Sequence, residues 1–268
     1  MTADSVAAAE SPARGAVVRE AWATLAHLAF VAMFVAATVR IGKRDWNFFV
    51  FLVVEDGAIE SLTAAFLLLT AATTHHLALG YRRFGRRGLA TALWLGAAAF
   101  FVAGMEEISW GQRLFGIETP VAIAENNMQG ELNLHNHPLF HGTNEVRGFL
   151  VVGAYGTFCG LAYALLRRRA RTERAARRMD ALRLFVVPVR FSPYFLALLV
   201  YIVLRRQDSP LISDHFPQKR LVKEIAECLF AIGCFLVAFY RLRTEGVCPR
   251  DPSLPDPTAT ASTSSGAR

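Results

Sequence analysis

One stretch of this 268-residue chain combines residue types that could do acid–base and metal chemistry. It covers residues 104–141, opens with Gly-Met-Glu-Glu-Ile-Ser-Trp-Gly-Gln-Arg and ends among three histidines. Carboxylates and imidazoles move protons and bind zinc, iron or manganese, and an arginine orients phosphate or another anionic group. The stretch follows an apolar run, and ionisable groups inside a membrane, which cost roughly 2.5–3.5 kcal/mol each at full depth, are kept mainly for function. We therefore interpret it as the candidate site.

The first half of the stretch supplies the predicted catalytic groups. Glu106 and Glu107 are adjacent carboxylates, and helical spacing would place Glu106, Ser109 and Arg113 on one face. The predicted catalytic residues are Glu60, Glu106, Glu107, Gln112 and Arg113. In the alternative interpretation, the two glutamates mark a helix end in the headgroup layer with Arg113 as their ion-pair partner, and Trp110 is an aromatic-belt anchor.

The second half supplies the predicted metal ligands. Glu131 and His135 are four residues apart, as are His137 and His141, and this spacing would bring each pair to one face of a helix. Pro138 is allowed at a first helical position. The predicted ligands of a divalent metal such as zinc are Asp56, Glu131, His135, His137 and His141. In the alternative interpretation these histidines are surface residues of a loop.

Composition indicates which class of protein carries this site. The chain is 53% hydrophobic and only 19% charged, which is too apolar for a typical soluble domain. Its net charge of +7 comes from arginine runs beside apolar spans, the usual pattern of cytoplasmic loops, so nucleic-acid binding is not expected. Its four cysteines show no Cys-x-x-Cys pairing, so neither a disulfide framework nor a zinc knuckle is predicted. The expected environment is the lipid bilayer.

Hydropathy divides the chain into six apolar spans. They lie at residues 21–39, 55–79, 89–108, 149–166, 182–204 and 221–240. Each is near the roughly 20 residues that a helix needs to cross the hydrocarbon core. Residues 48–54 are expected to be interfacial or a short lead-in to the second span, and Pro188 and Pro193 are expected to kink the fifth. The predicted fold is an all-α polytopic membrane helix bundle of about six transmembrane helices, with a long outer loop or re-entrant segment between helices 3 and 4.

The ends of the chain have a different composition. Residues 1–20 predict a disordered leader, residues 21–243 the transmembrane helical domain, and residues 244–268 a disordered tail rich in Pro, Ser and Thr. The first span is expected to be a retained helix, with cleavage as a signal peptide near Ala36 as the alternative.

Lysine and arginine are unevenly distributed among the loops. With alternating spans, 15 fall in the leader, the second and fourth loops and the start of the tail, against nine in the other three loops. The positive-inside rule then predicts a multi-pass protein of the bacterial inner (cytoplasmic) membrane with both termini cytoplasmic. Glu106, Glu107 and the segment around Glu131 would meet the top of the second span on the extracytoplasmic face. Because several carboxylates would gather there, a counter-charge such as Arg113, a divalent cation or shared protons is expected.

The motif residues resemble a known group. Glu-Glu-x-Ser-Trp-Gly-Gln-Arg, followed by Gln-x-Glu-x-Asn-Leu-His-Asn and preceded by Glu-Asp-Gly-x-x-Glu, resembles a family of uncharacterised bacterial polytopic membrane proteins over residues 46–242. The resemblance implies a membrane fold and a shared site, and no established activity. A fainter analogy is to ceramidase-like membrane hydrolases, which use a Ser, an Asp and three His around zinc. The chain departs from these in having six spans rather than seven, and histidines in one loop rather than on separate helices.

Three functions fit these features. The first is a metal-dependent membrane hydrolase or transferase acting on a lipid or lipid-linked substrate, in which the metal activates water and Glu106 or Glu107 moves the proton. The second is an ion- or proton-coupled transporter, although a polar cluster at one face rather than at the midplane argues against it. The third is a non-catalytic membrane assembly protein.

Overall fold

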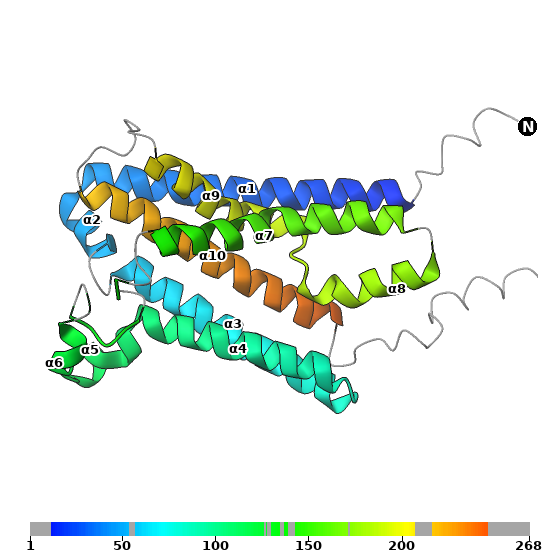
Figure 1. Cartoon of the computed structure of the whole chain (residues 1–268). Helices are drawn as coiled ribbons and strands as arrows, with labels where there is room; N and C mark the ends of the chain where they lie inside the picture. Colours follow the sequence, from blue (N-terminus) through cyan, green and yellow to red (C-terminus); the bar gives the residue numbers. More distant parts are fainter. Residues whose placement is uncertain are drawn as a thin grey trace, which may run out of the picture.

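All regular secondary structure in the described part of the chain is helical (Figure 1). The computed structural model describes residues 12–53, 57–125, 127, 130–134, 137–138, 143–170, 172–206 and 216–245. The long helices are α1 (Pro12–Arg44), α3 (Ala58–Arg83), α4 (Arg87–Glu107), α7 (Thr143–Arg169), α9 (Ser192–Arg206) and α10 (Phe216–Glu245). The shorter ones are α2 (Trp46–Val53), α5 (Gln112–Phe115), α6 (Val121–Ala124) and α8 (Glu173–Leu182).

In the described part of the chain, six helical segments are long and apolar enough to cross a membrane. They are Gly15–Arg40, Ala58–Arg83, Arg87–Glu107, Thr143–Arg169, Arg183–Arg205 and Leu221–Glu245. The predicted all-α membrane bundle is therefore confirmed, and the chain is a multi-pass membrane protein.

Helix α10 lies at the centre of the bundle. It packs against α3 on one side and α9 on the other, while α4 pairs with α3 and α7 with α9. Its residues Cys228, Leu229 and Ala231 are fully buried. By contrast, α4 and α7 expose large apolar side chains such as Leu95 and Val151, as expected of helices that face lipid. The packing leaves the start of α3, the end of α4 and the starts of α7 and α10 at one end of the bundle (Figure 1).

The fifth span is discontinuous around Pro188, as its prolines predict. Residues 186–188 are not helical and separate two single 3-10 turns, Arg183–Phe185 and Val189–Phe191. The backbone groups freed by this break find side-chain partners, as the interior of a membrane protein requires. Nη2 of Arg241 donates to the carbonyl oxygens of Arg183 and Val186, both at 2.6 Å. Pro193 instead falls in the first turn of α9, where proline is tolerated, so it causes no second kink.

Small residues let α7 and α9 approach closely. Gly153, Gly156 and Gly160 lie on one face of α7 and are buried. A Cβ atom added at Gly156 would lie 2.1 Å from Cγ of Phe195 on α9. Close helix contact through such residues is a common packing mode in membranes.

We expect Gly156→Ala to lower the free energy of unfolding by about 1–3 kcal/mol, because the added methyl group forces α7 and α9 apart. Gly148 lies on the same helix, and a Cβ atom added there would meet nothing within 4 Å. Gly148→Ala is therefore the matched control and should leave stability unchanged or raised. Thermal unfolding of the purified variants in detergent measures the difference. Equal stability of the two variants would contradict this helix contact.

The ends of the helical domain differ from their predicted positions. Helix α1 begins at Pro12, earlier than residue 21, and Glu20 accepts hydrogen bonds from the guanidinium of Arg190, so part of the predicted leader belongs to the bundle. Helix α10 continues to Glu245. Residues 1–11 and 246–268, which hold the rest of the predicted leader and tail, lie outside the described residues.

Helix α8 was not predicted, because its arginine-rich sequence was interpreted as a connecting loop. It begins after an N-cap, in which Oγ1 of Thr172 accepts a hydrogen bond from the backbone N–H of Ala175. An exposed ion pair of Arg167 with Asp180, 2.9 Å long, joins it to the end of α7.

Candidate functional site

The chain reverses sharply where α4 ends. Helix α4 stops at Glu107, and Ser109, Trp110 and Gly111 follow with φ angles of 45°, 57° and 73°. This left-handed region costs a residue with a side chain roughly 1–2 kcal/mol, so two such residues in succession need support from their surroundings. The expectation that Glu106, Ser109 and Arg113 share one helical face is wrong, because the α-helix does not continue through this turn.

Glu106 ties the turn to a distant part of the loop. Its Oε1 accepts a 2.6 Å hydrogen bond from Nε1 of Trp110, and its Oε2 accepts a 2.5 Å bond from the backbone N–H of Leu134. The carboxylate is buried. A charged acceptor that binds two donors away from water holds them more firmly than a neutral one would.

A polar network around Ser109 and Glu131 fixes the rest of the loop. The hydroxyl of Ser109 donates to Oε2 of Glu131 at 2.5 Å, and Nδ2 of Asn133 donates to both groups at 2.9 Å. Nδ2 of Asn127 in turn donates to the carbonyl oxygen of Asn133 at 2.8 Å. All four residues are buried.

Gln112 closes this network from the other side. Its Oε1 accepts a 2.7 Å hydrogen bond from the backbone N–H of Leu132, and its Nε2 donates to Oγ1 of Thr119. We call Glu106, Ser109, Gln112, Asn127, Glu131 and Asn133 the loop network. The motif residues thus hold a defined loop beside the end of α4.

A second polar group lies among the helices. Lys223 on α10 places its Nζ 2.8 Å from Oε1 of Glu145 on α7 and 3.7 Å from Oε1 of Glu227. Nη1 of Arg205 on α9 lies 3.2 Å from Oε2 of the same Glu145. Lys223 and Glu145 are largely shielded from solvent, with 19% and 11% of their side chains exposed, whereas Arg205 is exposed.

Glu107 extends this second group. Its carboxylate interacts electrostatically with Glu224, Glu60 and Lys223, and also with the adjacent Glu106, so helices α3, α4 and α10 all contribute charges at this point. We call Glu60, Glu107, Glu145, Arg205, Lys223, Glu224 and Glu227 the helix-end cluster. Among the described residues, this cluster contains five carboxylates and two cations.

The predicted catalytic residues are therefore divided between two groups. Glu106 and Gln112 belong to the loop network, and Glu60 and Glu107 to the helix-end cluster. The backbone of Arg113 lies in α5, and its side chain falls outside the described part of the structure. In the described part of the helix-end cluster, Lys223 and Arg205 are the cations beside the carboxylates. The predicted role of Arg113 as their counter-charge stays a prediction.

Only some of the predicted metal ligands lie in the described part of the structure. Asp56, His135 and His141 lie outside the described residues. Glu131 lies in the loop network, and the backbone N–H of His137 donates to the Leu134 carbonyl oxygen at 3.0 Å. Residues 130–134 are not helical, so the helix expected to bring Glu131 and His135 to one face does not form there. The corresponding expectation for His137 and His141 falls largely on residues outside the described part of the chain. Across the described residues, no group of three or more His, Cys, Asp and Glu side chains has an arrangement that could hold a metal ion.

Several residues of both groups were not among the predicted site residues. Glu145, Arg205 and Lys223 each carried a usable signal, because each is an ionisable residue at the end of an apolar span. Asn127 carried none, since an asparagine in a loop is ordinary until its partners are known.

Comparison with known proteins gives no assignment. No family model, curated protein or solved structure matches the chain.

Proposed function

We propose that this protein is a membrane-embedded hydrolase or transferase that acts on a lipid or lipid-linked substrate at the end of the bundle where α4 stops. The observation that carries this proposal is the setting of Glu107, which ends α4, is partly buried and interacts electrostatically with other carboxylates and Lys223. A carboxylate in such a setting can accept and return a proton, which is the task of a general acid–base. Arg113 would orient an anionic group of the substrate.

A divalent metal such as zinc is part of the proposal. Glu131 is the described residue that best fits a ligand, because Ser109 and Asn133 donate hydrogen bonds to its Oε2. Hydrogen bonds of this kind orient ligating carboxylates in metal sites. The metal would activate water for attack on the substrate.

An ion- or proton-coupled transporter is the second candidate. The helix-end cluster brings charges from α3, α4, α7, α9 and α10 together, which supports ion binding, while its position at one end of the bundle rather than at the midplane counts against a transporter. Carboxylates that exchange protons or cations during a movement of the helices would couple that movement to an ion gradient.

The test uses purified wild-type protein and two variants, Glu107→Gln and Glu118→Gln, the latter at an exposed glutamate of the loop. Each is incubated with a bacterial total lipid extract, and the lipids are compared by mass spectrometry before and after. We expect wild type and Glu118→Gln to convert a lipid, and Glu107→Gln to lose about 10²–10⁴-fold of that rate, the usual contribution of a general acid–base. Metal analysis of the wild-type protein and of His137→Ala accompanies the assay.

Other results would select other functions. Proton or cation flux in proteoliposomes without lipid conversion would favour the transporter. A third result would favour a non-catalytic assembly protein. In that case the purified protein shows neither ion flux nor lipid conversion, and Glu107→Gln behaves as wild type in the membrane.

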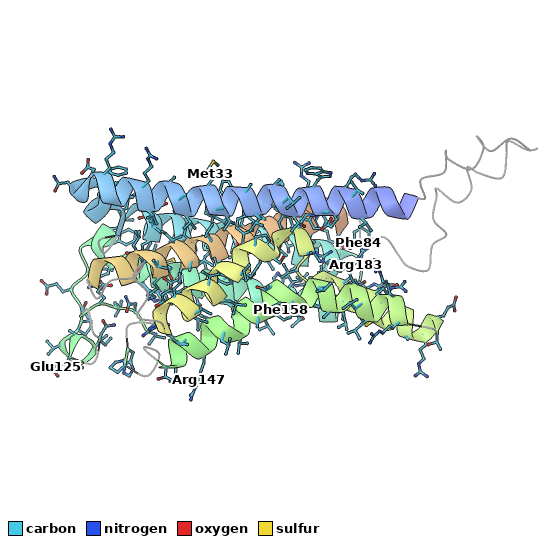
Figure 2. All side chains as sticks on the ribbon, turned by 90° about the horizontal axis from the view of Figure 1, so that it is seen from above. Met33, Phe84, Glu125, Arg147, Phe158 and Arg183 are labelled. Carbon is cyan, nitrogen blue, oxygen red and sulfur yellow. The ribbon has the colours of Figure 1, made fainter. Side chains whose placement is uncertain are left out.

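We call the end of the bundle where α4 stops the site end. We further propose that the site end faces the extracytoplasmic side of a bacterial inner membrane, with both termini in the cytoplasm. The opposite end of the bundle, marked by Phe84 and Arg183 in Figure 2, carries the arginine-rich turns, which favours this orientation. A membrane-impermeant thiol probe added to intact cells should label a cysteine placed at Thr143 and not one placed at Thr172. The reverse labelling pattern would place the site in the cytoplasm.

A further inference from the structure

The loop that follows α4 exposes an unusual amount of apolar surface. Between Gln112 and Ala124, five large apolar side chains are open, in contrast to the buried polar residues of the loop network. Their exposed fractions are 81% for Leu114, 72% for Phe115, 48% for Ile117, 71% for Val121 and 39% for Ile123. Soluble surfaces rarely gather so many large apolar side chains, so this face is expected to be covered. We call these five residues the apolar loop face.

The loop begins at the boundary of the membrane. Helix α4 has 21 residues, which gives a length of about 30 Å at 1.5 Å per residue, the thickness of the hydrocarbon core. Its outward side chains Leu95, Phe101 and Val102 are exposed, as expected for contact with acyl chains. Glu107 therefore lies close to the edge of the hydrocarbon, and the loop starts a few residues later. The apolar loop face therefore follows α4 in the chain a few residues beyond this edge.

A second segment at the same end has the same character. Helix α2, with the sequence Trp-Asn-Phe-Phe-Val-Phe-Leu-Val, exposes Phe48 and Phe51. Figure 1 shows α2 on one side of this end of the bundle and α5 and α6 on the other. Two apolar segments at one level on opposite sides are what a surrounding lipid leaflet requires.

The loop presents this face in a fixed way. The left-handed residues Ser109 to Gly111 turn the chain, and Gln112 then binds both Leu132 and Thr119. The polar groups of the loop are thus occupied by its own hydrogen bonds, while the five apolar side chains remain exposed. Glu125 lies at the outer edge of the loop (Figure 2), where a charged side chain can reach water.

We propose that residues 112–124 form a membrane-inserted loop whose apolar face lies in the lipid leaflet at the site end of the bundle. Short helices with one apolar face settle at the boundary between headgroups and acyl chains in this way. The partner is the acyl-chain layer of the membrane that already surrounds α4. This contact does not depend on the reaction at Glu107, and it would hold for an enzyme and for a transporter alike.

The test places the photoreactive residue p-benzoylphenylalanine at single positions of the full-length chain in native membranes. Phe115 is the first position, because an aromatic side chain replaces an aromatic one, and Val121 is the second. Leu95 on the exposed face of α4 is the lipid-facing reference, and Glu125 is the water-facing control. After irradiation, the adducts are separated on gels and identified by mass spectrometry.

We expect phospholipid adducts at positions 115 and 121 in yields similar to those at 95 and several-fold above those at 125. Adduct yields at 115 and 121 no higher than at 125 would show that the face is open to water and would overturn the proposal. A cross-link to a second copy or to another protein in place of lipid would also overturn it. If the variant at 115 does not accumulate, the one at 121 decides. Lipid adducts without any lipid conversion by the purified protein would support the inserted loop while contradicting the proposed enzyme.

Discussion

Lys223→Met is expected to lower the free energy of unfolding by about 3–5 kcal/mol, the usual cost of removing one partner from a buried ion pair. Methionine keeps the length of the side chain and removes its charge. Glu145 and Glu227 would then lose the ammonium that lies 2.8 and 3.7 Å from their carboxylate oxygens. Arg205 would still lie beside Glu145, but the ion pair of Glu227 with Lys223 would be gone. Thermal or denaturant unfolding of the purified protein in detergent measures the loss.

Two further variants separate the ion pair from a general effect of losing a cation. Arg243 lies on the same helix at the opposite end and is exposed, so Arg243→Met should change stability by less than about 1 kcal/mol. Adding Glu227→Gln to Lys223→Met should recover part of the loss, because one uncompensated carboxylate is removed. Stability of Lys223→Met equal to that of Arg243→Met would show that the helix-end cluster does not stabilise the bundle.

Glu106→Ala is expected to release the loop from the end of α4. The variant leaves two donors, Nε1 of Trp110 and the backbone N–H of Leu134, without their buried carboxylate. Hydrogen bonds to a charged group contribute about 1.5–3 kcal/mol each, so the free energy of loop opening should fall by roughly 3 kcal/mol or more. Amide hydrogen exchange of residues 109–134 measures this directly, and it should accelerate while exchange in α10 stays unchanged.

Matched variants make this result specific. Glu118→Ala, at an exposed residue of the same loop, should leave exchange as in wild type. Glu106→Gln should be intermediate, because its amide oxygen can still accept one of the two hydrogen bonds. If Glu106→Ala exchanges no faster than Glu118→Ala, the loop is held by something other than Glu106.

These predictions concern neighbouring residues with different roles, which the sequence alone could not separate. Glu106 and Glu107 are adjacent and were predicted to serve one site. The structure directs Glu106 to the loop and Glu107 to helices α3 and α10. The helical period could not be extended past Glu107, because Ser109, Trp110 and Gly111 adopt left-handed φ angles. No local sequence pattern predicts these angles for two residues that are not glycine, Ser109 and Trp110.

The sequence by itself determined the membrane bundle, because the signal for a span is local. A run of about 20 apolar residues must be helical in lipid whatever its neighbours are. For the same reason the sequence determined that ionisable residues gather at the ends of the spans. It predicted kinks at both Pro188 and Pro193, of which only the one at Pro188 is present. Only the tertiary structure decided which of these residues meet. Lys223 pairs with Glu145, far away in the chain, because α10 lies at the centre of the bundle near α7. Such pairings depend on how helices pack, and helix packing is set by shape complementarity along whole faces, which no short motif encodes.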